Sequence, residues 1–269
     1  MNPGAAARRP RTGAPLWRAW CLGGAVVVVL LALVPPLSTA ARHDEFAWAV
    51  QFSLFAIAVP ALVAVGAPWR LFRLAVGPTG TPSGIVDRIA DRRRRHRELP
   101  WSLALIACDL GAAIAWHAPG VVASVTRHGW LVVVEAASLL VFGLGLWLEL
   151  VASPPLTPRS GHLRRAALAA AAMWSFWILA YVVGLSDHGF YRSFHHLAGG
   201  LSEAADQQIA SALLWFAAAA AFVPVIFWNA YRWLQTEDDP DAELLALARA
   251  ERRRGTPPMA SGSGGPAAT

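Results

Sequence analysis

The sequence predicts an all-α, polytopic membrane protein, a bundle of about six transmembrane helices with both termini in the cytoplasm. Hydrophobic residues make up 56% of the chain and charged residues only 15%. The apolar residues gather in runs of about 20, the length that a helix needs to cross a hydrocarbon core of about 30 Å. The arginines fall between these runs, so membrane topology and anionic lipid explain the positive charge, and no nucleic-acid partner is expected.

The apolar runs define one transmembrane domain over residues 16–234. The predicted spans are about 16–37, 46–66, 101–117, 130–151, 166–185 and 207–234. A basic tail at 1–15 and a cytoplasmic tail at 235–269 flank this domain, and we expect the first tail and the end of the second to be disordered. The first run exceeds the roughly 7–15 residues of a signal-peptide core, so we expect it to be retained; cleavage after Ser38-Thr39-Ala40 is the alternative.

Proline and glycine mark the ends and irregularities of these runs. The prolines concerned are Pro35-Pro36, Pro60, Pro154-Pro155 and Pro224. We expect Pro224 to kink the last span. A short polar link with a turn at Pro119-Gly120 is predicted between the third and fourth spans, and a short interfacial helix in the arginine-rich part of the loop before the third span.

The distribution of arginine predicts the topology. The chain has 23 basic residues, all of them arginine, and only Arg42, Arg127 and Arg192 fall in loops that a six-span topology places outside. This 20-to-3 split places both termini in the cytoplasm by the positive-inside rule. The absence of lysine and the richness in arginine and alanine are typical of a bacterial genome of high GC content, so we expect a multi-pass protein of the bacterial plasma membrane.

Histidines gather at the predicted outer face and suggest a metal site there. The candidate ligands are His117, His128, His195 and His196. Neutral imidazole is the commonest protein metal ligand and suits copper and zinc. His117 and His128 flank one outer loop, and His195-His196 lie in the next. The alternative is that solvated loops simply carry polar residues, since no pair shows the helical i, i+4 spacing of a metal site.

Two carboxylates fall within predicted spans. Asp109 lies near the middle of the third span and Glu135 near the start of the fourth. Ionisable groups inside the membrane are costly and usually face the bundle interior, where they relay protons or hold ions. A small transporter that uses Asp109 and Glu135 is therefore one hypothesis, and a neutral, hydrogen-bonded carboxylic acid is the alternative. The chain has no nucleophile elbow, phosphate-binding glycine loop or HExxH motif, so no enzymatic activity is predicted.

Three segments, in order, resemble the membrane-embedded CtaG-type assembly factors of caa3-type cytochrome c oxidases. They are Val50-Gln51 through Pro60 to Gly66-Ala67-Pro68; Trp116-His117-Ala118-Pro119 followed by His128 and Glu135; and Asp206-Gln207-Gln208-Ile209-Ala210 followed by Trp215. Order and spacing agree over about residues 46–233, most of the predicted membrane domain. The chain is therefore identified as a member of this family.

The resemblance implies a function in oxidase assembly. It implies an integral membrane protein, embedded in the lipid bilayer, that presents copper at its outer face to a maturing cytochrome c oxidase subunit by ligand exchange. His117 would be the best candidate ligand, and Glu135 a proton partner or a support for the ligand. The same resemblance makes the Asp206-Gln207-Gln208 element a further functional candidate.

The sequence departs from the family where copper chemistry would be expected. The family's HxxxH pattern in the second span falls on Trp48 and Phe52, and the histidine that commonly follows the fourth-span glutamate is Ala136. The chain is thus a divergent member that lacks several family histidines. Either His128, His195 or His196 completes a smaller ligand set around His117, or the protein is a metal-free scaffold of the same fold that binds a partner protein.

Overall fold

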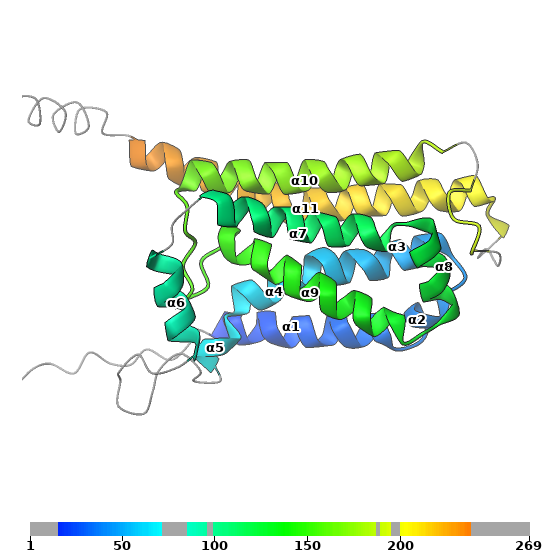
Figure 1. Ribbon diagram of the computed structural model, residues 1–269, viewed down its shortest axis with the longest axis horizontal. Coiled ribbons are helices and arrows are strands. Elements are labelled where there is room, and N and C mark those ends of the chain that lie inside the picture. The colour runs from blue at the N-terminus through cyan, green and yellow to red at the C-terminus, as the bar shows by residue number, and fades with distance from the viewer. Residues whose placement is uncertain (1–15, 72–84, 96–98, 187–188, 195–199, 238–269) are drawn as a thin grey trace, which may run out of the picture.

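The computed structural model describes residues 16–71, 85–95, 99–186, 189–194 and 200–237 (Figure 1). The predicted tail at 1–15 lies outside the described residues, as do His195, His196 and nearly all of the predicted tail at 235–269. Apart from one isolated bridge between Ser153 and Leu156, the described residues contain only helices, turns and loops. The predicted all-α class is confirmed.

Five stretches of helix are long and apolar enough to cross a membrane. They are α1 (Leu16–Leu33), the continuous stretch Glu45–Gly66, α9 (Leu131–Leu150), α10 (His162–Gly184) and α11 (Glu203–Glu237). A sixth span results if α7 (Leu99–Trp116) and α8 (Pro119–Arg127), which meet at 67°, count as one broken span. The chain is therefore a multi-pass membrane protein of five to six candidate spans, and its orientation in the membrane stays a prediction.

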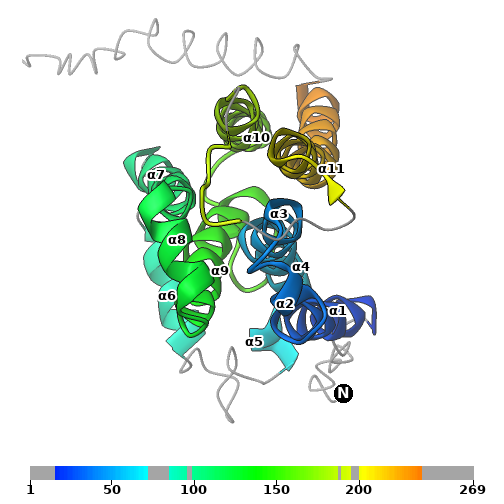
Figure 2. The ribbon, with the colours of Figure 1, turned by 90° about the vertical axis from the view of Figure 1, so that its right-hand side faces the viewer.

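The spans form two layers (Figure 2). Helices α10 and α11 pair as a hairpin, and α11 packs on the N-terminal part of the second span while α10 contacts α7 and α9. The second span lies at the centre of the bundle and is the most buried of the candidate spans. We call the end of the bundle that holds α8 and the starts of α9 and α11 the α8 end, and the opposite end, near α6 (Ile85–Arg95), the α6 end (Figure 1).

The second span is irregular because of Pro60. It consists of α3 (Glu45–Ser53), a π-helical turn η1 (Leu54–Ala58) and α4 (Val59–Gly66). Proline lacks an N–H and its ring collides with the carbonyl four residues earlier, and the π-helical turn relieves both problems. The turn packs against Gly143 of α9, where an added Cβ would lie 2.8 Å from Pro60 Cγ and 3.0 Å from the Ala56 carbonyl oxygen. Glycine at this position allows the two spans to approach closely.

The predicted polar link between the third and fourth spans is wrong, because this stretch is the helix α8. Pro119 stands at the first turn of α8, where its missing N–H costs no hydrogen bond and its fixed φ suits a helix. Val122 and Val125 are buried, so α8 has an apolar face that holds it against the bundle. The short helix predicted before the third span is confirmed as α6, and its place at the membrane interface stays a prediction.

Three span boundaries differ from the predicted ones by four residues, and the others by no more than three. α1 ends at Leu33, four residues before the predicted boundary, because the residue before a proline disfavours the helical conformation. α10 begins four residues early, at His162, and α11 four residues early, at Glu203. α11 also continues through Pro224 without a break in the helix.

A buried ion cluster stabilises the α6 end. The Glu149 side chain is 1% exposed, and its carboxylate lies 2.8 Å from Arg93 Nη2 and 3.3 Å from Arg159 Nε. Ser102 Oγ donates a hydrogen bond of 3.1 Å to the other carboxylate oxygen. Burial lowers the pKa of the Arg93 guanidinium, and the Glu149 carboxylate opposes that shift. The cluster joins α6, α7 and α9, and it is not among the features predicted from the sequence.

Candidate functional site

His117 lies at the α8 end, in the bend between α7 and α8, and is 7% exposed. Its Nδ1 is 2.9 Å from the carbonyl oxygen of Ala113, one turn earlier in the chain. A carbonyl oxygen can only accept, so Nδ1 carries the proton and Nε2 carries the lone pair. Nε2 is therefore the atom through which His117 could bind a metal.

Aromatic rings surround the imidazole of His117. Its ring centroid is 4.9 Å from that of Trp48 and 4.4 Å from that of Phe52. Trp48 in turn contacts Tyr191 and Phe194, at centroid distances of 5.5 and 6.2 Å. We call these five residues the aromatic cluster. It brings together α3, the α7–α8 bend and the segment 189–194 that precedes α11.

Two rings of the aromatic cluster stand where the resemblance implies imidazoles. Trp48 and Phe52 are four residues apart on α3, and their rings are 5.7 Å apart and on the same side as His117. Neither a phenyl ring nor an indole offers a lone pair to a metal, since the indole nitrogen is a donor only. The cavity beside Trp48 and His117 measures about 10 Å³, room for about one water molecule. These residues do not fit a copper centre.

Tyr191 connects the cluster to the α7–α8 bend. Its hydroxyl donates a hydrogen bond of 3.0 Å to the carbonyl oxygen of His117. Burial and the nearby carboxyl group of Glu45 raise the pKa of the Tyr191 phenol, so the group stays protonated as this bond requires. Sequence reasoning missed Tyr191, because a single tyrosine in a polar loop carries no signal of its own.

The two predicted intramembrane carboxylates have different surroundings. Glu135 is 1% exposed, and among the described residues neither carboxylate oxygen has a hydrogen-bond partner. The Trp48 indole is the side chain that interacts with it, so Glu135 borders the aromatic cluster. Asp109 is also buried, but it lies eight residues before His117, about 12 Å deeper along α7. Glu135 therefore lies beside Trp48, whereas Asp109 lies deeper along α7.

The other predicted metal ligands do not join His117 in the described residues. His128 is exposed at the far end of α8, with Nδ1 3.2 Å from the Ser124 carbonyl oxygen. α8 holds nine residues, so about 13 Å of helix separates the two histidines. His195 and His196 lie outside the described residues. Within the described part of the chain, no group of three or more His, Cys, Asp or Glu side chains could hold a metal ion.

The Asp206-Gln207-Gln208 element holds helix ends together. The Asp206 carboxylate accepts hydrogen bonds from the backbone N–H groups of Glu45, at 2.7 Å, and Phe46, at 3.0 Å, and so caps the start of α3. The Gln207 side chain accepts one from the Phe190 N–H and donates to the carbonyl oxygens of Val183 and Ser186. Two of the three candidates thus have a structural role at the α8 end.

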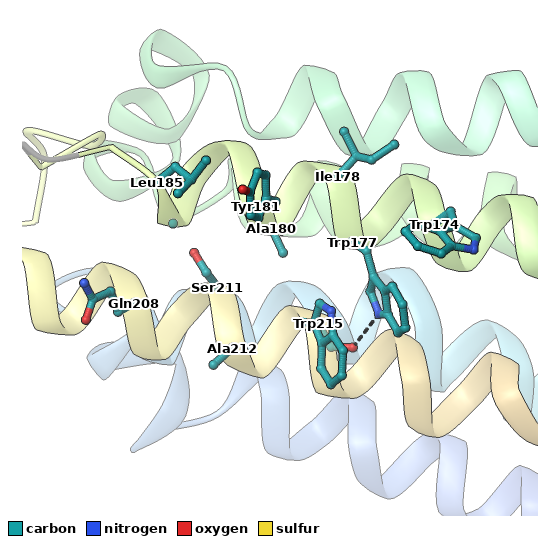
Figure 3. A pocket seen from close by; sticks show the side chains of 11 residues that line it. Trp174, Trp177, Ile178, Ala180, Tyr181, Leu185, Gln208, Ser211, Ala212 and Trp215 are labelled. Carbon is teal, nitrogen blue, oxygen red and sulfur yellow. Dashed lines mark hydrogen bonds between the residues drawn. The ribbon is translucent and has the colours of Figure 1, made fainter.

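Gln208 lines a groove of about 620 Å³ between α10 and α11. Figure 3 shows Trp174, Ile178, Tyr181 and Leu185 along α10, and Gln208, Ser211, Ala212 and Trp215 along α11. The rings of Trp177 and Trp215 stack with centroids 4.5 Å apart, and the Trp177 indole N–H donates to the Trp215 carbonyl oxygen. Gly184 permits the close approach of the helices, since an added Cβ would lie 2.9 Å from Ser211 Oγ. We call this hollow the α10–α11 groove.

The sequence matches one protein-family model, described as cytochrome c oxidase caa3 assembly factor (Caa3_CtaG), over residues 4–236. This match covers all six predicted spans. No curated protein and no solved structure matches the chain.

Proposed function

Because the chain belongs to the caa3 cytochrome c oxidase assembly factor family, we propose that it assists oxidase assembly by holding a transmembrane helix of an oxidase subunit, without a copper centre around His117. The family is one of assembly factors and not of enzymes. The chain is a membrane protein of this family, and the proposal concerns how it acts.

The aromatic cluster carries this proposal. A copper centre around His117 needs further nitrogen, sulfur or oxygen donors within bonding distance of its Nε2. Instead Trp48 and Phe52 pack on the imidazole at centroid distances of 4.9 and 4.4 Å. Such packing stabilises the junction of α3 and α7 and leaves no room for ligand exchange.

The α10–α11 groove supports the choice of partner. Its lining is nearly all apolar and lies on two candidate spans, so we infer that its occupant comes from within the membrane. The exposed Ala212 leaves room on α11 for the approach of another helix, since helix pairs in membranes meet at small residues. Large aromatic anchors beside Ala212 are typical of binding hot spots. An oxidase subunit is the partner that the family description favours.

Copper presentation on a reduced ligand set is the second candidate function. One observation favours it: Phe194 belongs to the aromatic cluster, and His195 and His196 follow it directly in the chain. Their place in the chain, directly after a ring of the aromatic cluster, is the reason to test His195 and His196 together with His117.

A substitution that fills the groove tests the proposed partner contact. Ala212→Trp would fill the α10–α11 groove, whereas Val141→Trp adds the same ring to an exposed position of α9. We expect Ala212→Trp to lower the amount of assembled oxidase in membranes by about tenfold, the effect of about 1.4 kcal/mol of lost binding free energy. We expect Val141→Trp to leave it unchanged. Equal oxidase levels in both variants, at equal levels of the assembly factor, would contradict the proposal.

A further inference from the structure

A second hollow lies at the α8 end, between α8 and the segment 189–194. Its volume is about 570 Å³. The residues that line it are Pro119, Ala123, Thr126, Arg127, Phe190, Arg192 and Ser193. We call it the arginine pocket. It is separate from the aromatic cluster and from the α10–α11 groove, with which it shares no lining residue.

The charged side chains that line the arginine pocket are all positive. Arg127 and Arg192 both line it, and no acidic residue is among its lining residues in the described part of the chain. These are two of only three arginines in the loops that the six-span topology places on this side. Two guanidinium groups on one hollow suit an anion with several acceptor oxygens, because guanidinium binds phosphate and carboxylate through paired hydrogen bonds.

The donors in the pocket suit a phosphate group. Arg127 uses its Nε for a hydrogen bond of 2.8 Å to the Ala123 carbonyl oxygen, which leaves its two terminal nitrogens to face a ligand. Ser193 Oγ is buried and has no hydrogen-bond partner among the described residues. A buried hydroxyl without a partner is costly, and an acceptor oxygen on a bound anion would satisfy it.

The position of the pocket indicates where the anion comes from. α7 ends at Trp116, α9 begins at Leu131 and α10 ends at Gly184, so the pocket lies at the level of the ends of three candidate spans (Figure 1). Phospholipid headgroups occupy this level, just outside the hydrocarbon core. Pro119, Ala123 and Phe190 add an apolar wall that suits the glycerol and upper acyl part of a lipid.

We propose that Arg127, Arg192 and Ser193 form a binding site for a phosphate group, either the headgroup of an anionic phospholipid or free inorganic phosphate. A phosphate held between α8 and the segment 189–194 would fix that segment and with it Tyr191, whose hydroxyl bonds to the His117 carbonyl oxygen. The site thereby links membrane lipid to the geometry of the aromatic cluster. It does not depend on the partner contact proposed for the α10–α11 groove.

The test compares three single variants of the full chain: Arg127→Gln, Arg192→Gln and the matched control Arg42→Gln. Arg42 is an exposed arginine at the same end of the bundle, and it is not among the pocket's lining residues. Each protein is purified in mild detergent, and bound phospholipid is quantified by mass spectrometry. In a second arm, delipidated protein receives inorganic phosphate or an anionic phospholipid, and the shift of its Tm is measured.

We expect the wild type and Arg42→Gln to retain anionic phospholipid. Arg127→Gln and Arg192→Gln should retain about tenfold less, the expected effect of losing one charge-assisted contact. A Tm increase with inorganic phosphate alone, lost in the same two variants, would assign the site to free phosphate. Equal lipid retention in all four proteins together with no phosphate effect would overturn the proposal. An equal loss in the Arg42→Gln control would overturn it too, because it would indicate general surface charge.

Discussion

The imidazole of His117 meets the ring of Phe52 edge to face, with centroids 4.4 Å apart and planes at 89°. An edge-to-face contact at this distance is a favourable packing arrangement of two rings. Phe52 and Trp48 stand one helical turn apart on α3, at the two positions where the family resemblance implies imidazoles. The chain thus has the fold of the family, but aromatic side chains pack between α3 and α7 at the positions where the resemblance implies two histidine ligands.

Restoring the histidine pair should restore metal binding. In the double variant Trp48→His/Phe52→His, two imidazoles would lie one turn apart on α3, on the side of His117. We expect the purified variant to bind about one Cu(I) per chain, measured by metal analysis under reducing conditions. Trp48→Ala/Phe52→Ala, which opens the same space without donors, is the control and should bind none. A folded histidine variant without copper would show that this geometry does not suit a metal.

The helix cap supplied by Asp206 should contribute to stability. Asp206→Ala removes the acceptor of two backbone N–H groups at the start of α3, so we expect the free energy of unfolding to fall by about 1–2 kcal/mol. Glu203→Ala, at an exposed position in the first turn of α11, should change it by less than about 0.5 kcal/mol. Thermal unfolding in detergent measures both. Equal effects of the two substitutions would argue against the cap.

The ion cluster at the α6 end should be sensitive to loss of one partner. Arg93→Ala removes the 2.8 Å contact of the buried Glu149 carboxylate and leaves Arg159, at 3.3 Å, as its cation, so we expect a loss of about 1.5–3 kcal/mol. The neighbouring Arg92 is exposed on the same helix, and Arg92→Ala should have little effect. Thermal unfolding of both variants in detergent would measure the difference. A similar stability of both variants would contradict a structural role for the cluster.

A substitution of Asp109 distinguishes the proposed function in oxidase assembly from the transporter hypothesis. Asp109→Asn keeps the shape of the side chain and removes its ionisable proton. We expect liposomes that contain the wild type or the variant to show the same proton flux as liposomes without protein. A wild-type flux above that background, abolished by Asp109→Asn, would support the transporter hypothesis instead.

Hydrophobicity predicted the spans well because each span must satisfy its backbone hydrogen bonds internally and cover a fixed membrane thickness. Pro119-Gly120 misled the sequence analysis, since proline marks a turn and the first turn of a helix equally well. Only the burial of Val122 and Val125 distinguishes a helix from a turn at this position, and burial depends on the rest of the bundle.

The candidate site was predicted only in part. His117 and Glu135 each lie beside Trp48, a residue that the sequence analysis noted only because the family has a histidine there. The contribution of Tyr191 depends on a contact over 74 positions of the chain, which no local pattern encodes. Glu149 could have been found: it is a carboxylate within an apolar run, the same signal that singled out Asp109 and Glu135.

The copper content of the purified wild-type protein tests the central claim most directly. Wild type, His117→Ala and His195→Ala/His196→Ala are purified in detergent under reducing conditions, loaded with Cu(I) and challenged with a chelator. We expect all three to retain equally little copper, because Trp48 and Phe52 fill the ligand positions around His117. About one tightly held copper per wild-type chain, lost in His117→Ala, would contradict the account and establish copper presentation on a reduced ligand set.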